Sequence, residues 1–164
     1  MLSIIDIIED TTVDGPGFRT AIYAAGCPNK CPGCHNPESW DIHKGKKVRT
    51  EEIVEKVLAD EFANVTFSGG DPLHPANRED IARLAEEIRG RYPNKTIWLY
   101  TGYDWEQICE FALFKNIDVV VDGEFIEAYK DGSLHWKGSS NQRVIDVQRS
   151  LLMGEAVLYE EPDT

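Results

Sequence analysis

The chain has 164 residues, of which 41% are hydrophobic and 28% charged, a composition typical of one soluble globular domain spanning residues 1–164. Aspartate and glutamate outnumber lysine and arginine by 29 to 17, so the formal net charge is −12. This acidic excess repels a phosphate backbone and argues against nucleic-acid binding. No apolar stretch approaches the about 18 residues of a membrane span, and the first residues lack a signal-peptide pattern. We therefore expect a cytoplasmic protein.

The first part of the chain predicts two strands, a loop and a helix. Apolar runs indicate strands over residues 2–8 and 19–25, and a polar stretch containing a glycine indicates a loop over residues 41–48. Thr50 is expected to cap a helix, because two glutamates follow it where the helix dipole favours anions. Four apolar residues form the expected inner face of this helix: Ile53, Val54, Val57 and Leu58.

The second part of the chain alternates strands with helices. Strands are expected over residues 64–67, 96–100, 118–121 and 144–147. Asn77 is expected to cap a helix that ends at Gly90, and Asp104 with Gln107 forms a capping-box pattern for another helix. The expected inner faces carry Ile81, Leu84, Ala85 and Ile88 in the first, and Ile108, Phe111 and Ala112 in the second. This alternation predicts an α/β fold with a mostly parallel sheet, whereas the apolar residues 151–159 fit no element.

Turns rich in glycine and aspartate follow the expected strands. The cysteine-rich segment follows residues 19–25, and Ser68-Gly69-Gly70, Thr101-Gly102 and Asp122-Gly123 follow three later strands. Ligands of α/β proteins bind at the carboxyl ends of parallel strands, which meet at one edge of the sheet. We therefore expect these turns to share one surface.

Three of the four cysteines lie in residues 26–40, GCPNKCPGCHNPESW, at the spacing C-x3-C-x2-C. The thiolates of Cys27, Cys31 and Cys34 sit within eight residues on a loop rich in proline and glycine, so they converge readily on one metal centre. A 4Fe–4S cluster normally takes four thiolates, so three would leave one iron open for a ligand. An open position distinguishes a reactive metal site from a structural one.

Other interpretations of this segment remain open. Cys31 and Cys34 form a CxxC pair of the thioredoxin type, and with His35 they spell the attachment pattern of c-type haem. A Cys3His zinc site is a further alternative. The first two interpretations leave Cys27 without a role, and the third requires adjacent residues to bind one ion. Cys109 lies on an expected helix and is interpreted as a small buried hydrophobe, with a fourth cluster ligand as the alternative.

The cysteine spacing resembles the signature of the radical S-adenosylmethionine (SAM) enzymes. The wider segment is similar to the activating proteins of the anaerobic, class III ribonucleotide reductase. Further matching segments run in order over most of the chain: DGPGFR at 14–19, SGGDPL at 68–73, YTGY at 100–103, VDGEF at 121–125 and GSSNQR at 138–143. The resemblance implies a partial (βα) barrel, which in a chain this short is expected to be shortened and open-sided.

The resemblance also implies an oxidoreductase that reductively cleaves SAM at a 4Fe–4S cluster. The 5′-deoxyadenosyl radical would then generate a glycyl radical on the anaerobic ribonucleoside-triphosphate reductase. A low-potential donor such as a flavodoxin would supply the electron, in an anaerobic cytoplasm. Two alternatives stay open: an activase of another glycyl radical enzyme, such as the formate lyase, and a non-catalytic CxxC zinc or redox adaptor. The short chain and the HNPESW sequence favour the ribonucleotide reductase over the formate lyase.

Residue roles follow from the same resemblance. Cys27, Cys31 and Cys34 would bind three irons, and the amino and carboxylate groups of SAM would bind the fourth. Gly33 and His35 flank the last cysteine and would touch the adenine or the cluster edge; His35 is alternatively a loop residue that fixes the segment through a hydrogen bond.

The downstream motifs would contribute to the same cofactor site. Ser68, Gly69, Gly70 and Asp71 correspond to the glycine motif for the methionine amino group, although the superfamily often has Glu at the position of Asp71. Asp122 is either a contact to the ribose of SAM or a turn-forming residue. The 14–19 segment resembles a loop near the path of the substrate peptide; the alternative is a hairpin connection with a solvated Arg19.

Overall fold

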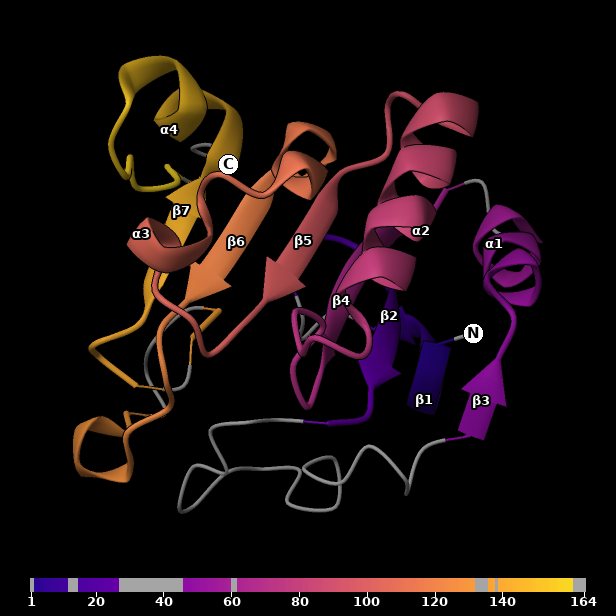
Figure 1. Ribbon diagram of the computed structural model, residues 1–164, viewed down its shortest axis with the longest axis horizontal. Coiled ribbons are helices and arrows are strands. Elements are labelled where there is room, and N and C mark those ends of the chain that lie inside the picture. Colours follow the sequence, from indigo (N-terminus) through magenta and orange to yellow (C-terminus); the bar gives the residue numbers. More distant parts are fainter. Residues whose placement is uncertain are drawn as a thin grey trace.

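The computed structural model describes residues 2–11, 15–26, 46–59, 62–131, 136–137 and 139–160, and within them the chain forms a seven-stranded sheet (Figure 1). The strands are β1 (Leu2–Thr11), β2 (Arg19–Ala24), β3 (Lys46–Val48), β4 (Asn64–Gly69), β5 (Ile97–Tyr100), β6 (Val119–Asp122) and β7 (Arg143–Asp146). The helices are α1 (Thr50–Ala59), α2 (Arg78–Arg91), α3 (Trp105–Ile108) and α4 (Val147–Met153), with short 3-10 helices η3 (Ala112–Asn116) and η4 (Glu127–Tyr129). No helix among these residues is long and apolar enough to cross a membrane.

The strand order is β3-β1-β2-β4-β5-β6-β7. Strands β2, β4, β5 and β6 run parallel, and β1, β3 and β7 join them through antiparallel pairs. The expected α/β class is confirmed, with a parallel centre and antiparallel edges. Strand β3 falls inside residues 41–48, which were expected to be a loop. The sequence does not show this strand, because its two lysines are exposed and its pairing with β1 uses the backbone alone.

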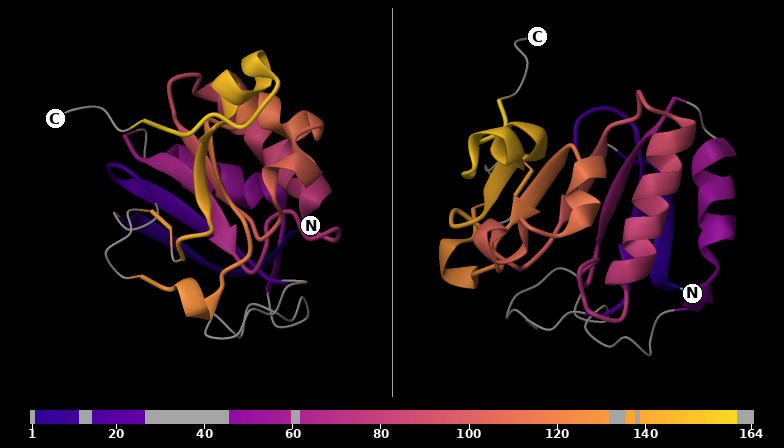
Figure 2. Two further views of the ribbon diagram at one scale, coloured as in Figure 1. Left: turned by 90° about the vertical axis from the view of Figure 1, so that its left-hand side faces the viewer. Right: turned by 45° about the horizontal axis from the view of Figure 1, so that its top comes forward.

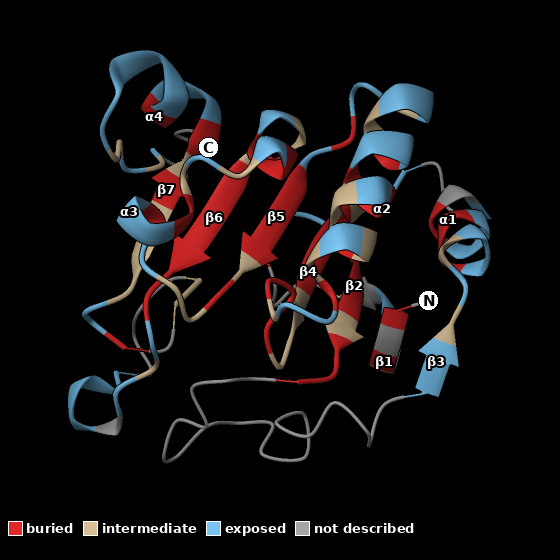
Figure 3. Cartoon of the chain, viewed as in Figure 1, coloured by how far each residue is buried: buried red, intermediate tan, exposed pale blue. Residues whose placement is uncertain are grey.

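Helices α1 and α2 lie side by side over one face of the sheet (Figures 1 and 2). Apolar side chains that point to this face alternate along the strands and form the main core. All buried residues of the chain's described part are red in Figure 3. The sheet contributes Ile22, Val65, Phe67, Ile97, Leu99, Val120 and Ile145, and the helices contribute Ile53, Val57, Ile81, Leu84, Ile88 and Phe114. The opposite face carries a smaller cluster around Trp98, whose ring meets Trp136 and Tyr159 edge-on.

Arg19 begins β2 and is fully buried on the Trp98 side of the sheet. Its guanidinium donates hydrogen bonds to Thr66 Oγ1, Thr96 Oγ1 and the carbonyls of Pro16, Val65 and Thr96. The interpretation of Arg19 as a solvated residue is therefore wrong. It ties together the amino ends of β2, β4 and β5, at the edge opposite the glycine turns, because a buried guanidinium requires acceptors for its donors.

Several helix limits differ from the sequence expectations. Gly90 does not end α2, which continues to Arg91 and closes with the Tyr92 N–H on the Ile88 carbonyl. The helix at Asp104 stops after one turn, and the exposed Ala112 begins η3 instead of facing the core. Val147 begins α4, so the last strand ends one residue earlier than expected. These differences reflect tertiary packing, which overrides local propensity at element ends.

Candidate functional site at the carboxyl edge of the sheet

The glycine and aspartate turns do share one edge of the sheet, as their order along the chain predicted (Figure 1). Strand β4 ends at Gly69, Thr101 follows β5, and Asp122 ends β6. Antiparallel β7 begins at this edge, with Arg143 paired to Asp122. Strand β2 leads to the same edge and into the cysteine segment. The predicted site residues of that segment lie outside the described residues: Cys27, Cys31, Gly33, Cys34 and His35.

The turn after β4 packs directly against the end of β2. Gly69 has φ +105°, and a Cβ at this position would lie 2.5 Å from the backbone nitrogen and oxygen of Ala24. The Gly70 N–H donates to the Ala24 carbonyl at 2.8 Å, and the Asp71 N–H donates to the Gly26 carbonyl at 2.7 Å. Glycine is therefore required at residue 69 by close backbone approach. Ser68, Gly69 and Gly70 remain half-buried.

The Asp71 carboxylate connects the turn after β4 to the turn after β5. It is fully buried and accepts hydrogen bonds from Thr101 Oγ1 at 2.9 and 3.0 Å and from the Gly102 N–H at 2.9 Å. The Leu73 N–H donates to it at 2.9 Å. Burial raises the pKa of Asp71 to about 6, although the hydrogen bonds oppose this shift.

The titration of Asp71 leads to a stability prediction. The carboxyl binds its proton more tightly in the folded chain, with a pKa of about 6 against an ordinary 3.8, so its contribution to stability falls as pH rises from about 4 to 6. The shift corresponds to about 3 kcal/mol. Asp71→Asn cannot titrate. We therefore expect its free energy of unfolding, relative to that of the natural chain, to rise by about this amount from pH 4 to pH 7. Urea unfolding of both iron-free proteins across this range measures the difference, and a pH-independent difference contradicts the prediction.

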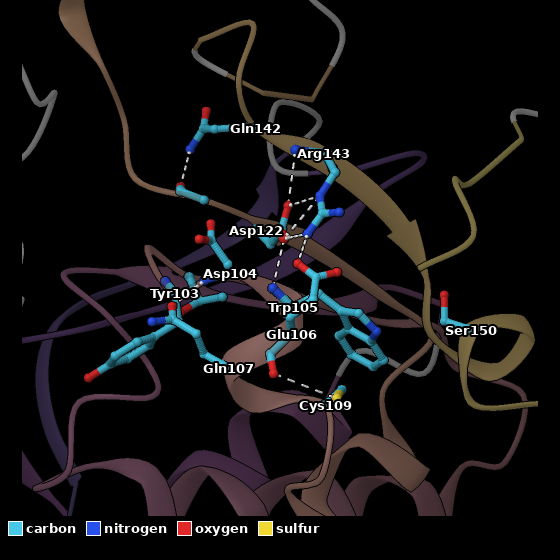
Figure 4. Close-up of polar contacts among 12 residues, drawn as sticks. Tyr103, Asp104, Trp105, Glu106, Gln107, Cys109, Asp122, Gln142, Arg143 and Ser150 are labelled. Atoms are coloured by element: carbon cyan, nitrogen blue, oxygen red, sulfur yellow. Dashed lines mark hydrogen bonds and ion pairs between the residues drawn. The ribbon is translucent and has the colours of Figure 1, made fainter. Parts of the chain in front are cut away.

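Asp122 is the centre of a second polar cluster, shown in Figure 4. It is 1% exposed and accepts from the Trp105 N–H at 2.8 Å and from Arg143 Nη2 at 2.5 Å. The Arg143 N–H and Nε also donate to it, and Nη2 reaches Glu106 Oε1 at 2.7 Å. The hydrogen bond to Asp122 and, to a smaller extent, the one to Glu106 hold the pKa of the Arg143 guanidinium above its ordinary value. The hydrogen bond from Arg143 in turn lowers the pKa of Glu106. The Asp122 side chain thereby joins the start of α3 to the start of β7.

The VDGEF and GSSNQR motifs form one structural unit. Gln142 Nε2 donates to the Gly123 carbonyl at 2.9 Å, and Asn141 Nδ2 donates to the Glu124 carbonyl at 2.8 Å. Ser139 Oγ accepts from the Ile126 N–H at 3.3 Å. The side chains of the later motif thus satisfy backbone groups of the earlier one and of Ile126, which follows it directly. Twelve residues separate the two motifs in the sequence, and neither one alone indicates this pairing.

Together these contacts make a chain of hydrogen bonds along the carboxyl edge, which we call the carboxyl-edge belt. Its members are Gly70, Asp71, Thr101, Gly102, Tyr103, Trp105, Asp122, Gly123, Gln142 and Arg143. Between the turns after β5 and β6, the Gly123 N–H donates to the Tyr103 carbonyl at 3.0 Å. The belt runs from the end of β2 to the start of β7, so the turns keep fixed positions relative to one another.

Sequence reasoning missed two features of this edge. Asn77 precedes α2, but its side chain makes no cap hydrogen bond; Nδ2 instead donates to the Ala25 carbonyl at 2.6 Å. Tyr23 on β2 pairs with Ser68 on β4, and Tyr100 on β5 comes one residue after the last β4–β5 pair; all three are half-buried on the face away from the helices. Cys109 is half-buried and packs against the core on the helix side, which agrees with its interpretation as a small hydrophobe. Of the missed features, only the placement of Tyr23, Ser68 and Tyr100 on one face had a sequence signal, which is the alternation of side chains along a strand.

Metal binding at this edge depends on the cysteine segment. No group of three or more histidine, cysteine or carboxylate side chains within the described ranges is arranged to hold a metal ion. In the sequence, Cys27 comes directly after Gly26, the last described residue before this segment, and Cys31 and Cys34 follow within eight residues. Soft thiolate ligands on a short segment suit an iron–sulfur cluster. The donor set therefore fits the group that the sequence implied.

Comparison with known proteins identifies the class. A family model described as a 4Fe-4S single cluster domain matches residues 13–145. The chain is a 4Fe–4S cluster-domain protein built on an open α/β sheet. A protein from Escherichia coli K12 named anaerobic ribonucleoside-triphosphate reductase-activating protein is 39% identical over 140 residues, covering 80% of this chain and 90% of the relative.

Two further relatives with the same name agree. One from Salmonella typhi is 39% identical over 140 residues, with 80% of this chain and 90% of the relative covered. One from Enterobacteria phage T4 is 37% identical over 135 residues, with 80% and 86% covered. The chain belongs to the family of anaerobic ribonucleoside-triphosphate reductase-activating proteins.

Proposed function

We propose that this protein is the activating enzyme of an anaerobic ribonucleoside-triphosphate reductase. The observation that carries the proposal is its 39% identity, over 80% of the chain, to relatives named for this activity. When bound and reduced, the cluster would supply one electron to SAM, which would split at its sulfonium C–S bond into methionine and a 5′-deoxyadenosyl radical; this radical would take a hydrogen atom from one glycine of the reductase. A low-potential donor such as a flavodoxin would provide the electron, in an anaerobic cytoplasm.

Cys27, Cys31 and Cys34 would hold the cluster in this proposal. Three thiolates leave one iron without a protein ligand, and the amino and carboxylate groups of SAM can occupy it. Gly33 and His35 flank the last ligand and would lie against the cluster or the adenine. The segment that carries all five residues starts at the end of β2, beside the turn after β4.

The turn at Ser68-Gly69-Gly70 would receive the amino group of SAM. The N–H groups of Gly70 and Asp71 already donate to the Ala24 and Gly26 carbonyls, whereas an amino group needs acceptors, so backbone carbonyls of the turn suit it. The Asp71 carboxylate accepts from its own turn and from the turn after β5, and Asp122 accepts from Trp105 and Arg143. We therefore assign both carboxylates to holding the belt that supports the cofactor, rather than to direct contact with SAM.

The sheet would act as a shortened partial barrel of the radical SAM type, open at one side. Its face away from the helices presents Tyr23, Ser68 and Tyr100 in a row next to the carboxyl edge. This half-buried row lies beside the proposed cofactor turn. A glycine-bearing segment of the reductase could approach SAM along it, because an open side admits a large protein substrate.

The test is the transfer of a radical to a glycine. The anaerobically reconstituted protein is mixed with SAM, dithionite and the ribonucleotide reductase or the formate lyase in separate samples. We expect a glycine-centred doublet in the electron paramagnetic resonance spectrum of the ribonucleotide reductase alone, and none without SAM. A doublet on the formate lyase alone would support the other activase. A colourless protein that holds one zinc and never cleaves SAM would support the adaptor instead.

A further inference from the structure

The last three residues before the first predicted cluster cysteine are held by one short segment of the chain. The carbonyls of Ala24, Ala25 and Gly26 each accept one hydrogen bond, from the Gly70 N–H at 2.8 Å, Asn77 Nδ2 at 2.6 Å and the Asp71 N–H at 2.7 Å. All three donors come from residues 70–77. The stem of the cysteine segment is therefore fixed at every carbonyl up to Cys27.

Asn77 is the single side-chain donor among these three contacts. Its side chain comes from the turn before α2 and reaches a carbonyl 52 residues earlier in the chain. Asn77 is 1% exposed, with backbone angles of φ −109° and ψ −23°, and it makes no side-chain cap hydrogen bond to α2. Asparagine at a helix start ordinarily caps the helix. Here the amide is directed at the stem instead, so the helix start does not explain its presence.

We propose that Asn77 is a positioning residue for the iron–sulfur cluster, an inference that rests on the function proposed above. Its amide fixes the Ala25 carbonyl, and Gly26, with φ +97°, then turns the chain into the cysteine segment. Holding this stem determines where the Cys27 thiolate enters the site. The partners that orient metal ligands contribute to metal affinity although they do not touch the metal. Asn77 thus acts on the cluster through the backbone of Ala25 and Gly26.

Two substitutions separate this role from packing. Asn77→Asp keeps the shape but, when ionised, replaces the donor by an oxygen that faces the Ala25 carbonyl, and Asn77→Ala removes the donor without adding repulsion. The matched control is Ser150→Ala: Ser150 is equally buried, and its hydroxyl also binds backbone groups, but it lies in α4 beside β7. Thermal unfolding of the iron-free variants shows how much general stability each one loses.

The measurement is the rate at which the reconstituted proteins lose iron to a chelator under anaerobic conditions, followed by the cluster absorbance. We expect about tenfold faster loss for Asn77→Ala, the factor that corresponds to one hydrogen bond, and a larger increase for Asn77→Asp. The electron paramagnetic resonance spectrum of the reduced cluster should also shift in Asn77→Ala and stay unchanged in Ser150→Ala.

Natural rates and spectra in both Asn77 variants would overturn the proposal. Equal acceleration in Ser150→Ala at the same loss of thermal stability would also overturn it, because the effect would then be general. If Asn77→Asp does not fold, Asn77→Ala decides the question alone. The readouts do not involve the reductase, so a cluster protein that fails to activate it would refute the proposed function and leave this test intact.

Discussion

Replacing Cys31 by alanine is expected to yield a folded protein that holds no stable 4Fe–4S cluster and does not cleave SAM. The physical reason is the number of ligands, since the segment supplies three thiolates to a cluster that normally takes four. With two thiolates left, a second iron would lack a protein ligand. SAM would then no longer have a single open iron to bind. The same result is expected for Cys27→Ala and Cys34→Ala.

Iron and sulfide analysis after anaerobic reconstitution measures this loss, and dithionite-dependent methionine release measures SAM cleavage. Cys109→Ala is the matched control, because Cys109 is the remaining cysteine and packs half-buried against the core on the helix side. It should keep about four irons per chain and full SAM cleavage. Retention of the cluster in Cys31→Ala, or its loss in Cys109→Ala, would refute the assignment of ligands.

The edge that carries the site could be predicted from the sequence, because strands and turns have local signals. Three of the expected strands end at a turn that contains glycine or aspartate, and parallel strands bring those turns together. The order of Gly69, Thr101 and Asp122 along the chain was therefore enough to place them at one edge. The capping pattern at Asp104 was equally local: the Gln107 side chain accepts from the Asp104 N–H at 2.9 Å.

The partners of the polar side chains could not be predicted, because they lie far away in sequence. Arg19 binds acceptors that are 46 to 77 residues distant, apart from the nearby Pro16 carbonyl. Asp71 meets Thr101 across 30 residues, and Asn77 meets Ala25 across 52. A sequence shows that such residues are polar, but only the folded sheet shows which backbone groups need them. For this reason Asn77 was interpreted as a helix cap.

Gly69→Ala is expected to destabilise the protein by at least about 3 kcal/mol. The added Cβ would lie 2.5 Å from both the nitrogen and the oxygen of Ala24, and these are backbone atoms of the neighbouring strand, which cannot move aside as a flexible side chain can. The φ of +105° at Gly69 adds strain for any residue with a Cβ. Urea unfolding of the iron-free protein measures the loss, which is a large part of the stability of a typical domain.

Gly90→Ala is the matched control, with an expected effect of opposite sign. Gly90 lies inside α2 and is exposed, and a Cβ added there would meet no atom within 4 Å, so alanine should stabilise the helix by about 0.5 kcal/mol. Similar losses at both positions would contradict the contact between β4 and β2. If Gly69→Ala separates these strands as expected, it also shifts Ala24 and the stem that leads to Cys27. The substitution should then lower the iron content of the reconstituted protein, whereas Gly90→Ala should leave it unchanged.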